Sequence, residues 1–194
     1  MRKIFTLIIA LFAMTQLKAQ IIDTFDSNML GWTEVVGKDG SAIITEGVMR
    51  LDSKISALTS TYAPIDPTKN FEMKATAVVK KINSDGHFGL IVDYKDDYNF
   101  SCFCIRKKDK DAVVIYQRWQ DNVVVGRREA DFKIEGKKNV QFDFLLKSRF
   151  DELELVINNM SVIKIKYSPI RHSGIGFVAY LEQTIDFDNL EFIQ

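Results

Sequence analysis

Apolar and polar residues alternate along most of this chain with a period of two. In the segment 71–80, Phe71, Met73 and Ala75 would share one face of a strand, while Glu72 and Lys74 would share the other. Such alternation predicts a strand with one buried face and one solvated face. The same pattern predicts about twelve strands in all, at 41–44, 48–51, 71–80, 87–94, 99–106, 112–119, 123–127, 140–147, 153–157, 162–167, 174–181 and 184–192.

Short turn sequences separate these segments. Examples are Glu46-Gly47, the tripeptide 120–122 and Asn158-Asn159, which is a strong hairpin signal. No stretch of a dozen residues carries the three-and-four apolar spacing of a helix. Many short strands with close turns predict an all-β fold, a two-sheet antiparallel jelly-roll sandwich.

The first nineteen residues have the pattern of a secretory signal peptide. Arg2 and Lys3 precede an apolar run at 4–14, and Ala19 offers a small residue before a cut at Gln20. The apolar run is shorter than the roughly 20 residues that span a bilayer; an uncleaved anchor is the alternative. We expect a signal peptide at 1–19, one β-sandwich domain at 20–194, and export to the periplasm, cell surface or medium.

The charge balance argues against two classes of partner. The full chain carries 26 basic and 26 acidic residues, and removal of Arg2, Lys3 and Lys18 leaves 23 basic and 26 acidic, a net charge near −3. Nucleic acids and anionic membranes both require a basic surface. We therefore expect no nucleic-acid partner and no membrane insertion after the signal is removed.

The two cysteines, Cys102 and Cys104, stand two residues apart in a predicted strand. Residues at that spacing lie about 6.7 Å apart on one face, too far for the roughly 3.5–4.5 Å between the Cβ atoms of a disulfide. We expect two buried thiols. A metal site using both sulfurs would need further ligands, for which His87 and His172 are the obvious candidates, but no zinc-type spacing accompanies them.

Several pieces, taken in order, resemble the concanavalin A-like lectin/glucanase superfamily, in particular its laminin-G-like and family-16-glucanase-like secreted modules. The pieces are Phe25-Asp26, Gly31-Trp32, 46–51, 70–72, 89–91, 97–100, Gly136 before Asn139, 153–159, 175–177 and 186–190. The resemblance implies a jelly roll with one concave, solvent-facing sheet and Trp32 in the core. Members of the superfamily bind sugars, cleave polysaccharides or bind proteins, and the fold alone does not choose between these roles.

No complete catalytic set stands in the sequence. Family-16-type glucanases use two glutamates around an aspartate on one strand, as a retaining carboxylate pair. The nearest match, Glu129, Asp131 and Glu135, is one residue too long, and we interpret it as a polar extended segment. Glu152 and Glu154 also share a strand face, as the solvated residues of any half-buried strand do. A nucleophile elbow of the G-x-S-x-G type and a phosphate loop are both absent from the sequence.

A sugar site needs an aromatic platform and planar polar side chains. If their strands lie in the concave sheet, Tyr116, Arg118, Tyr180, Glu182 and Asp93 could form a shallow ligand-binding site. In the alternative, the tyrosines cap the core and Arg118 pairs with a nearby acid.

The resemblance also implies a possible structural calcium ion between the N-terminal segment and the last strand. Its oxygen ligands would be Asp23 or Asp26, the carbonyl of Gly47, and Asp186 or Asp188. Asp188 has a competing use, which is to cap a strand end through backbone hydrogen bonds.

The function that these patterns favour is an exported, non-catalytic, lectin-like carbohydrate-binding module with a glycan or polysaccharide as partner. Two alternatives stay open: a divergent glycoside hydrolase acting on polysaccharide, and a protein-interaction or structural domain of the cell envelope.

Overall fold

The computed structural model describes residues 19–54, 58–67, 70–82, 85–108, 111–133, 141–169 and 173–194. The described residues contain fifteen strands and no helix. Residues 1–18 of the signal peptide expected at 1–19 lie outside the described residues, as do Glu135, Gly136, Asn139 and His172.

The larger sheet, sheet A, has nine antiparallel strands. Eight follow the order β13-β12-β11-β6-β15-β4-β3-β2, and β1 pairs with β15 beyond the end of β4. Their bounds are β1 Gln20–Asp23, β2 Val35–Gly37, β3 Gly40–Thr45, β4 Val48–Ser53, β6 Phe71–Ile82, β11 Gln141–Arg149, β12 Glu152–Ile157, β13 Met160–Lys166 and β15 Gln183–Ile193.

The smaller sheet, sheet B, has six antiparallel strands in the order β10-β9-β8-β7-β14-β5. Their bounds are β5 Leu58–Ala63, β7 His87–Asp96, β8 Asn99–Lys108, β9 Asp111–Gln120, β10 Val123–Lys133 and β14 Gly174–Tyr180. Sheet B takes strands from both halves of the chain, which brings residues 87–127 beside residues 174–180.

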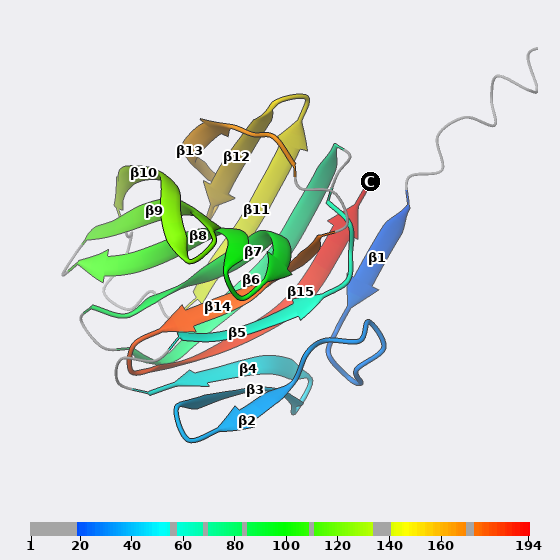
Figure 1. The fold of residues 1–194 in the computed structure, drawn as a ribbon. Helices are drawn as coiled ribbons and strands as arrows, with labels where there is room; N and C mark the ends of the chain where they lie inside the picture. Colours follow the sequence, from blue (N-terminus) through cyan, green and yellow to red (C-terminus); the bar gives the residue numbers. More distant parts are fainter. Residues whose placement is uncertain are drawn as a thin grey trace, which may run out of the picture.

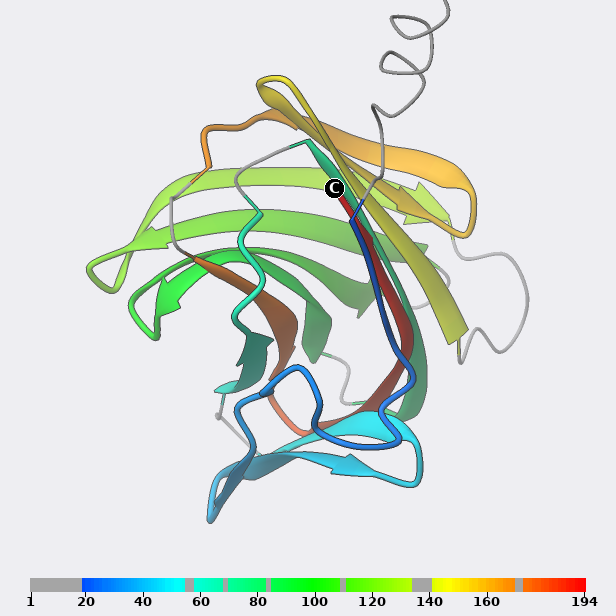
Figure 2. The ribbon, with the colours of Figure 1, turned by 90° about the vertical axis from the view of Figure 1, so that its right-hand side faces the viewer.

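The two sheets stack face to face (Figure 1). After a quarter turn, sheet A forms an arc and sheet B lies inside that arc (Figure 2). The two sheets do not close into a barrel, so the predicted two-sheet jelly-roll sandwich is confirmed.

Aromatic rings fill the space between the sheets. Phe177 of sheet B stacks on Phe187 of sheet A at 4.2 Å between ring centroids, and on Trp32 at 5.2 Å. The indole Nε1 of Trp32 donates a hydrogen bond to Asp23 over 2.8 Å, as a buried tryptophan requires for its polar edge. The prediction that Trp32 belongs to the core is confirmed, because only 3% of it is exposed.

The predicted turns have the backbone of two-residue hairpins. Asp121 and Asn122 both have positive φ angles, of 49° and 65°, and so do Asn158 and Asn159, at 49° and 64°. Asparagine and aspartate tolerate this left-handed conformation better than other side chains do. The hairpins β9–β10 and β12–β13 are therefore specified by local sequence.

Three strands do not show in the apolar pattern: β1, β2 and β5. The three residues of β2 are all exposed. In β5, the inward positions Thr59 and Thr61 are polar although both are buried. A search for alternating apolar residues passes over such segments, because pairing with neighbouring strands decides their conformation.

Candidate functional site

The outer face of sheet A is a ladder of opposite charges. Lys74 pairs with Glu191 at 2.5 Å, Arg149 with Glu72 at 2.6 Å, and Lys164 with Glu154 at 3.5 Å. Cross-strand pairs of this kind stabilise a solvated sheet face. Because these cations are paired within the sheet, they offer no unpaired charge that points to a ligand.

The outer face of sheet B is apolar at its centre. A second hydrophobic cluster, separate from the core between the sheets, contains Ile91, Tyr94, Phe100, Cys102, Cys104 and Val178, with Tyr62 and Trp119 packed against it. The rings of Phe100 and Trp119 stack at 6.0 Å with an angle of 18° between their planes. An apolar patch on the outer face of a sheet often marks a binding site.

A pocket of about 430 Å³ is hollowed in this face. Its floor consists of Phe100, Cys102, Cys104, Ile115 and Val178. Its remaining lining residues carry rings, amides and cations: His87, Arg106, Gln117, Trp119, Arg127 and Tyr180. We call this pocket the sheet-B pocket. Its volume lies within the range of small-molecule sites.

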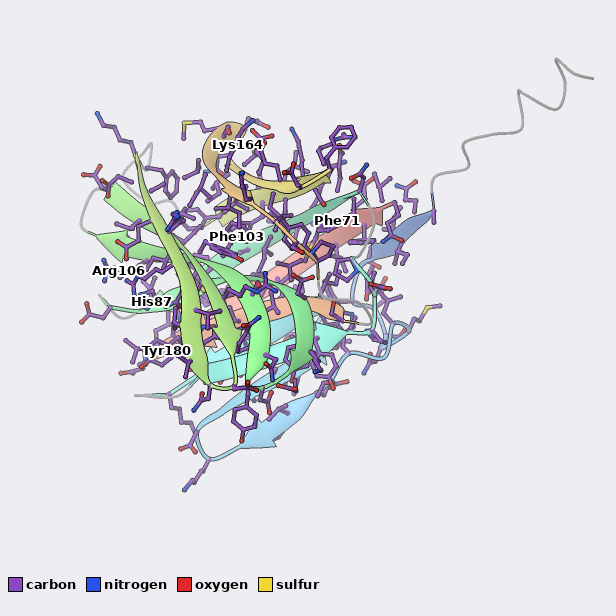
Figure 3. The ribbon with its side chains drawn as sticks, turned by 45° about the horizontal axis from the view of Figure 1, so that its top comes forward. Phe71, His87, Phe103, Arg106, Lys164 and Tyr180 are labelled. Atoms are coloured by element: carbon purple, nitrogen blue, oxygen red, sulfur yellow. The ribbon has the colours of Figure 1, made fainter. Side chains whose placement is uncertain are left out.

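Strand register assembles the pocket from distant parts of the sequence. His87 of β7 stands opposite Arg106 of β8 and opposite Tyr180 of β14. In the same way, Gln117 of β9 stands opposite Cys102 on one side and Arg127 on the other. Figure 3 shows Arg106, His87 and Tyr180 in a row on one side of the molecule, with Phe103 in the interior.

The charged side chains that line the pocket are the guanidinium groups of Arg106 and Arg127. Burial, followed by the charge of Arg106, lowers the pKa of His87; Asp85 opposes this shift, and the charge of Arg127 adds to it. The imidazole is therefore neutral at pH 7. Among the described residues that line the pocket, none is acidic.

Three of the five predicted ligand-binding residues come together on the inner side of sheet B, two of them buried. Tyr116 is only 7% exposed and packs in the main core against Phe103, with 5.0 Å between the ring centroids. Asp93 is fully buried and accepts a hydrogen bond from the hydroxyl of Tyr167 at 2.6 Å. Burial, followed by the charge of Asp93, raises the pKa of Tyr167.

Arg118 lies near this buried group and donates to the carbonyl of Ser168 at 3.4 Å. Tyr116 does not project from the open face of sheet B, because β9 turns it into the core, and the half-buried Arg118 lies on the same side of β9. The alternative, in which the tyrosine caps the core, describes Tyr116. Asp93 lies within β7, with a φ angle of 57°, where the register with β8 shifts.

The other two predicted residues separate from this group and from each other. Tyr180 lines the sheet-B pocket and is 38% exposed. Glu182 lies in the turn after β14 and forms an ion pair with Lys81 of β6. The structure thus leaves Tyr180 as the predicted residue that remains a candidate for ligand contact.

The residues that the sequence pattern did not single out are His87, Arg106, Gln117, Trp119 and Arg127. Strand alternation does place Gln117 and Trp119 on the face opposite Tyr116. It does not tell which face is inward, because the residues at 113–115 are apolar on both sides. Cys102 and Cys104 are free and buried, as expected. They belong to the outer cluster of sheet B, so placing these two residues on the outer side would have identified its open face.

Among the residues that the structure describes, the candidate catalytic acids do not form a cleft pair. Glu129 and Asp131 project from the edge strand β10, and Glu129 forms an ion pair with Arg127. That hydrogen bond with Arg127 lowers the pKa of Glu129, whereas a general acid for glycoside hydrolysis needs a raised value. Glu154 lies on sheet A, where a hydrogen bond from Ser161 lowers its pKa.

Three of the predicted calcium ligands form contacts with protein groups. The two oxygens of Asp23 accept hydrogen bonds from the amide of Phe25 and the indole of Trp32, both at 2.8 Å. Asp186 is paired with Arg50 at 2.7 Å, and Asp188 caps the amide of Asn189 at 2.6 Å. Within the described ranges, no three acidic, histidine or cysteine side chains are grouped to hold a metal ion. Asp26 and Gly47 lie close together, since a Cβ atom added at Gly47 would meet Oδ1 of Asp26 at 3.8 Å, and the calcium site stays a prediction.

A second pocket, of about 640 Å³, lies at the edge of sheet B beside the β2–β3 hairpin. Tyr62 and Tyr94 form a stacked pair there, with ring centroids 4.0 Å apart, and the hydroxyl of Tyr94 donates to Asp97 at 2.6 Å. Lys38 and Asp39 of the hairpin also line this edge pocket. The tyrosine pair belongs to the same outer hydrophobic cluster as Trp119.

Comparison with known proteins bears on the fold. No family model and no curated protein sequence matches this chain. Its structure matches the carbohydrate-binding module CBM66 from Bacillus subtilis with a TM-score of 0.64 at 17% identity, covering 84% of this chain and 96% of that one. It also matches a Bacillus licheniformis β-glucanase with a TM-score of 0.62 at 10% identity, covering 91% and 99%.

A third match is the exoplasmic/lumenal domain of VIP36 in a Ca²⁺/Man3GlcNAc-bound form. Its TM-score is 0.62 at 13% identity, covering 90% of this chain and 88% of that one. The chain has a concanavalin A-like fold. The resemblance stated from the sequence is thereby confirmed for the architecture. In this concanavalin A-like sandwich, the described residues include no helix of the length and apolarity needed to cross a membrane.

Proposed function

We propose that this protein is an exported carbohydrate-binding module that holds a glycan on the outer face of sheet B. The observation that carries the proposal is the sheet-B pocket itself, in which Trp119 and Tyr180 stand beside Gln117, His87 and Arg106. Aromatic rings offer flat apolar faces to sugar rings, while amide, imidazole and guanidinium groups bond to hydroxyl groups. The export step rests on the sequence pattern at 1–19.

The matched proteins support the proposal at the level of ligand class. Their names describe a carbohydrate-binding module, a β-glucanase and a domain with a bound Man3GlcNAc. The contrast between the two outer faces supports the location, because sheet A pairs its charges internally and sheet B presents rings and a pocket. The placement of Glu129 and Glu154 supports binding rather than hydrolysis.

The test is direct binding of the purified protein to a panel of polysaccharides and oligosaccharides. With any glycan that binds, Tyr180→Ala is expected to weaken binding by about tenfold, which is the scale of an interface residue that costs more than 1 kcal/mol when truncated. Isothermal titration calorimetry gives the two dissociation constants.

Tyr98→Ala is the matched control, since Tyr98 is an exposed tyrosine of the β7–β8 turn, outside the sheet-B pocket. It should bind like the unmodified protein. If no glycan in the panel binds, or if both variants bind equally, the proposed function is wrong.

A further inference from the structure

The cations of the sheet-B pocket differ in how they are neutralised. Arg127 is exposed, and its guanidinium donates to Oε1 of Glu129, with 2.9 Å between Nε and that oxygen. Arg106 is half-buried; among the described residues it forms no ion pair, and it donates none of the hydrogen bonds observed. A half-buried guanidinium that makes no direct ion pair or hydrogen bond gains from the approach of an anion or of hydroxyl groups.

No carboxylate lines the pocket beside Arg106, although the charge of Arg106 helps to lower the pKa of Glu129 on β10. Its cross-strand neighbours on the two sides are His87 and Val113, and the other lining residues are neutral apart from Arg127. Elsewhere on the molecule, exposed cations such as Lys74, Lys164 and Arg149 lie in ion pairs. The local positive charge is therefore a property of this pocket, in a chain whose expected mature form is slightly acidic.

A second observation points the same way. His87 stands opposite Arg106 and beside Tyr180, with 5.9 Å between the two ring centroids. Because the imidazole of His87 is neutral, Arg106 is the charged residue among Arg106, His87 and Tyr180. A ligand that lies on Tyr180 and Trp119 would bring its substituents to Arg106.

We infer that the glycan bound in the sheet-B pocket carries a negative charge, as a uronate carboxylate or a sulfate ester, and that Arg106 receives it. This inference rests on the proposed function. Guanidinium groups bind carboxylate and sulfate through two parallel hydrogen bonds, which a neutral hydroxyl group cannot replace in full. The aromatic rings distinguish such a ligand from a free inorganic anion, because a free anion gains nothing from them.

The experiment compares pairs of oligosaccharides that differ only in charge. The first pair is an oligogalacturonate and its fully methyl-esterified form, and the second is a sulfated galactan oligosaccharide and its desulfated form. We expect one charged member to bind at least about tenfold more tightly than its neutral form, the scale of one hydrogen bond to a charged group. The pair that shows the preference identifies carboxylate or sulfate as the source of the charge.

Two variants assign the preference to a residue. Arg106→Gln keeps a planar hydrogen-bonding group and removes the charge, so the charged and neutral forms should then bind alike. Arg149→Gln makes the same chemical change on sheet A, where Arg149 pairs with Glu72, and should keep the full preference. A thermal melt of each variant confirms that it is folded.

The remaining outcomes overturn the inference in distinguishable ways. If the charged and neutral forms bind equally, or if Arg106→Gln keeps the preference, the charge inference is wrong while glycan binding stands. If inorganic sulfate alone competes as well as the oligosaccharide, the pocket binds an anion rather than a charged glycan. If no glycan binds, charged or neutral, the proposed function fails as well.

Discussion

Replacing Trp119 with alanine is expected to weaken glycan binding by about a hundredfold, the effect of a strong aromatic anchor. The ring of Trp119 is held against Phe100 at 6.0 Å and lines the sheet-B pocket. Because this stacking fixes the ring before the ligand arrives, little conformational freedom is lost on binding. Titration calorimetry with a glycan identified in the panel measures the change.

Two controls make this result specific. Trp119→Phe keeps an aromatic face and should retain most of the affinity. Phe150→Ala removes an aromatic ring that is 88% exposed on the β11–β12 turn of sheet A and should leave affinity unchanged. Equal binding by Trp119→Ala and the unmodified protein would contradict the placement of the site.

A large loss of stability is expected from Gly89→Ala. Gly89 lies in β7 opposite Cys104 of β8, and a Cβ atom added there would lie 1.9 Å from the carbonyl oxygen of Phe103. The contact is with backbone, so a change of rotamer cannot relieve it and the strands must move apart. We expect the free energy of unfolding to fall by about 3 kcal/mol, the upper part of the usual range for overpacking.

Gly126→Ala is the matched control in the same sheet. A Cβ atom there would meet Cβ of Arg118 at 3.5 Å, an ordinary contact. Its unfolding free energy should stay within about 0.5 kcal/mol of the unmodified protein. Denaturant titration of the two variants compares them, and similar stabilities would show that β7 and β8 do not approach as closely as described.

Most of the sandwich can be predicted from the sequence because one face of each long strand is apolar. The clearest case is β6, whose buried residues alternate with half-buried ones from Phe71 to Val79. The turn residues Asn158 and Asn159 then fix where the chain reverses. In contrast, the pattern does not predict β5, because its buried residues Thr59 and Thr61 are polar.

The candidate site is less predictable than the fold. Strand alternation separates Tyr116 from Trp119, but the segment between 113 and 115 is apolar on both faces, so the sequence does not say which face is open. The approach of His87, Arg106 and Tyr180 depends on the register of three strands, one of which comes from the end of the chain. The pairing of β14 with β7 joins distant segments, so local sequence does not determine it.

The measurement that tests the central claim most directly is an NMR titration of the two indole Nε1–H signals with a bound glycan. Trp32 is buried between the sheets and hydrogen-bonded to Asp23, whereas Trp119 lines the sheet-B pocket. The account predicts that the signal of Trp119 shifts with glycan concentration while that of Trp32 stays in place, with Trp119→Phe used to assign the two signals. Saturating glycan binding that leaves the Trp119 signal unmoved would contradict a glycan site on the outer face of sheet B.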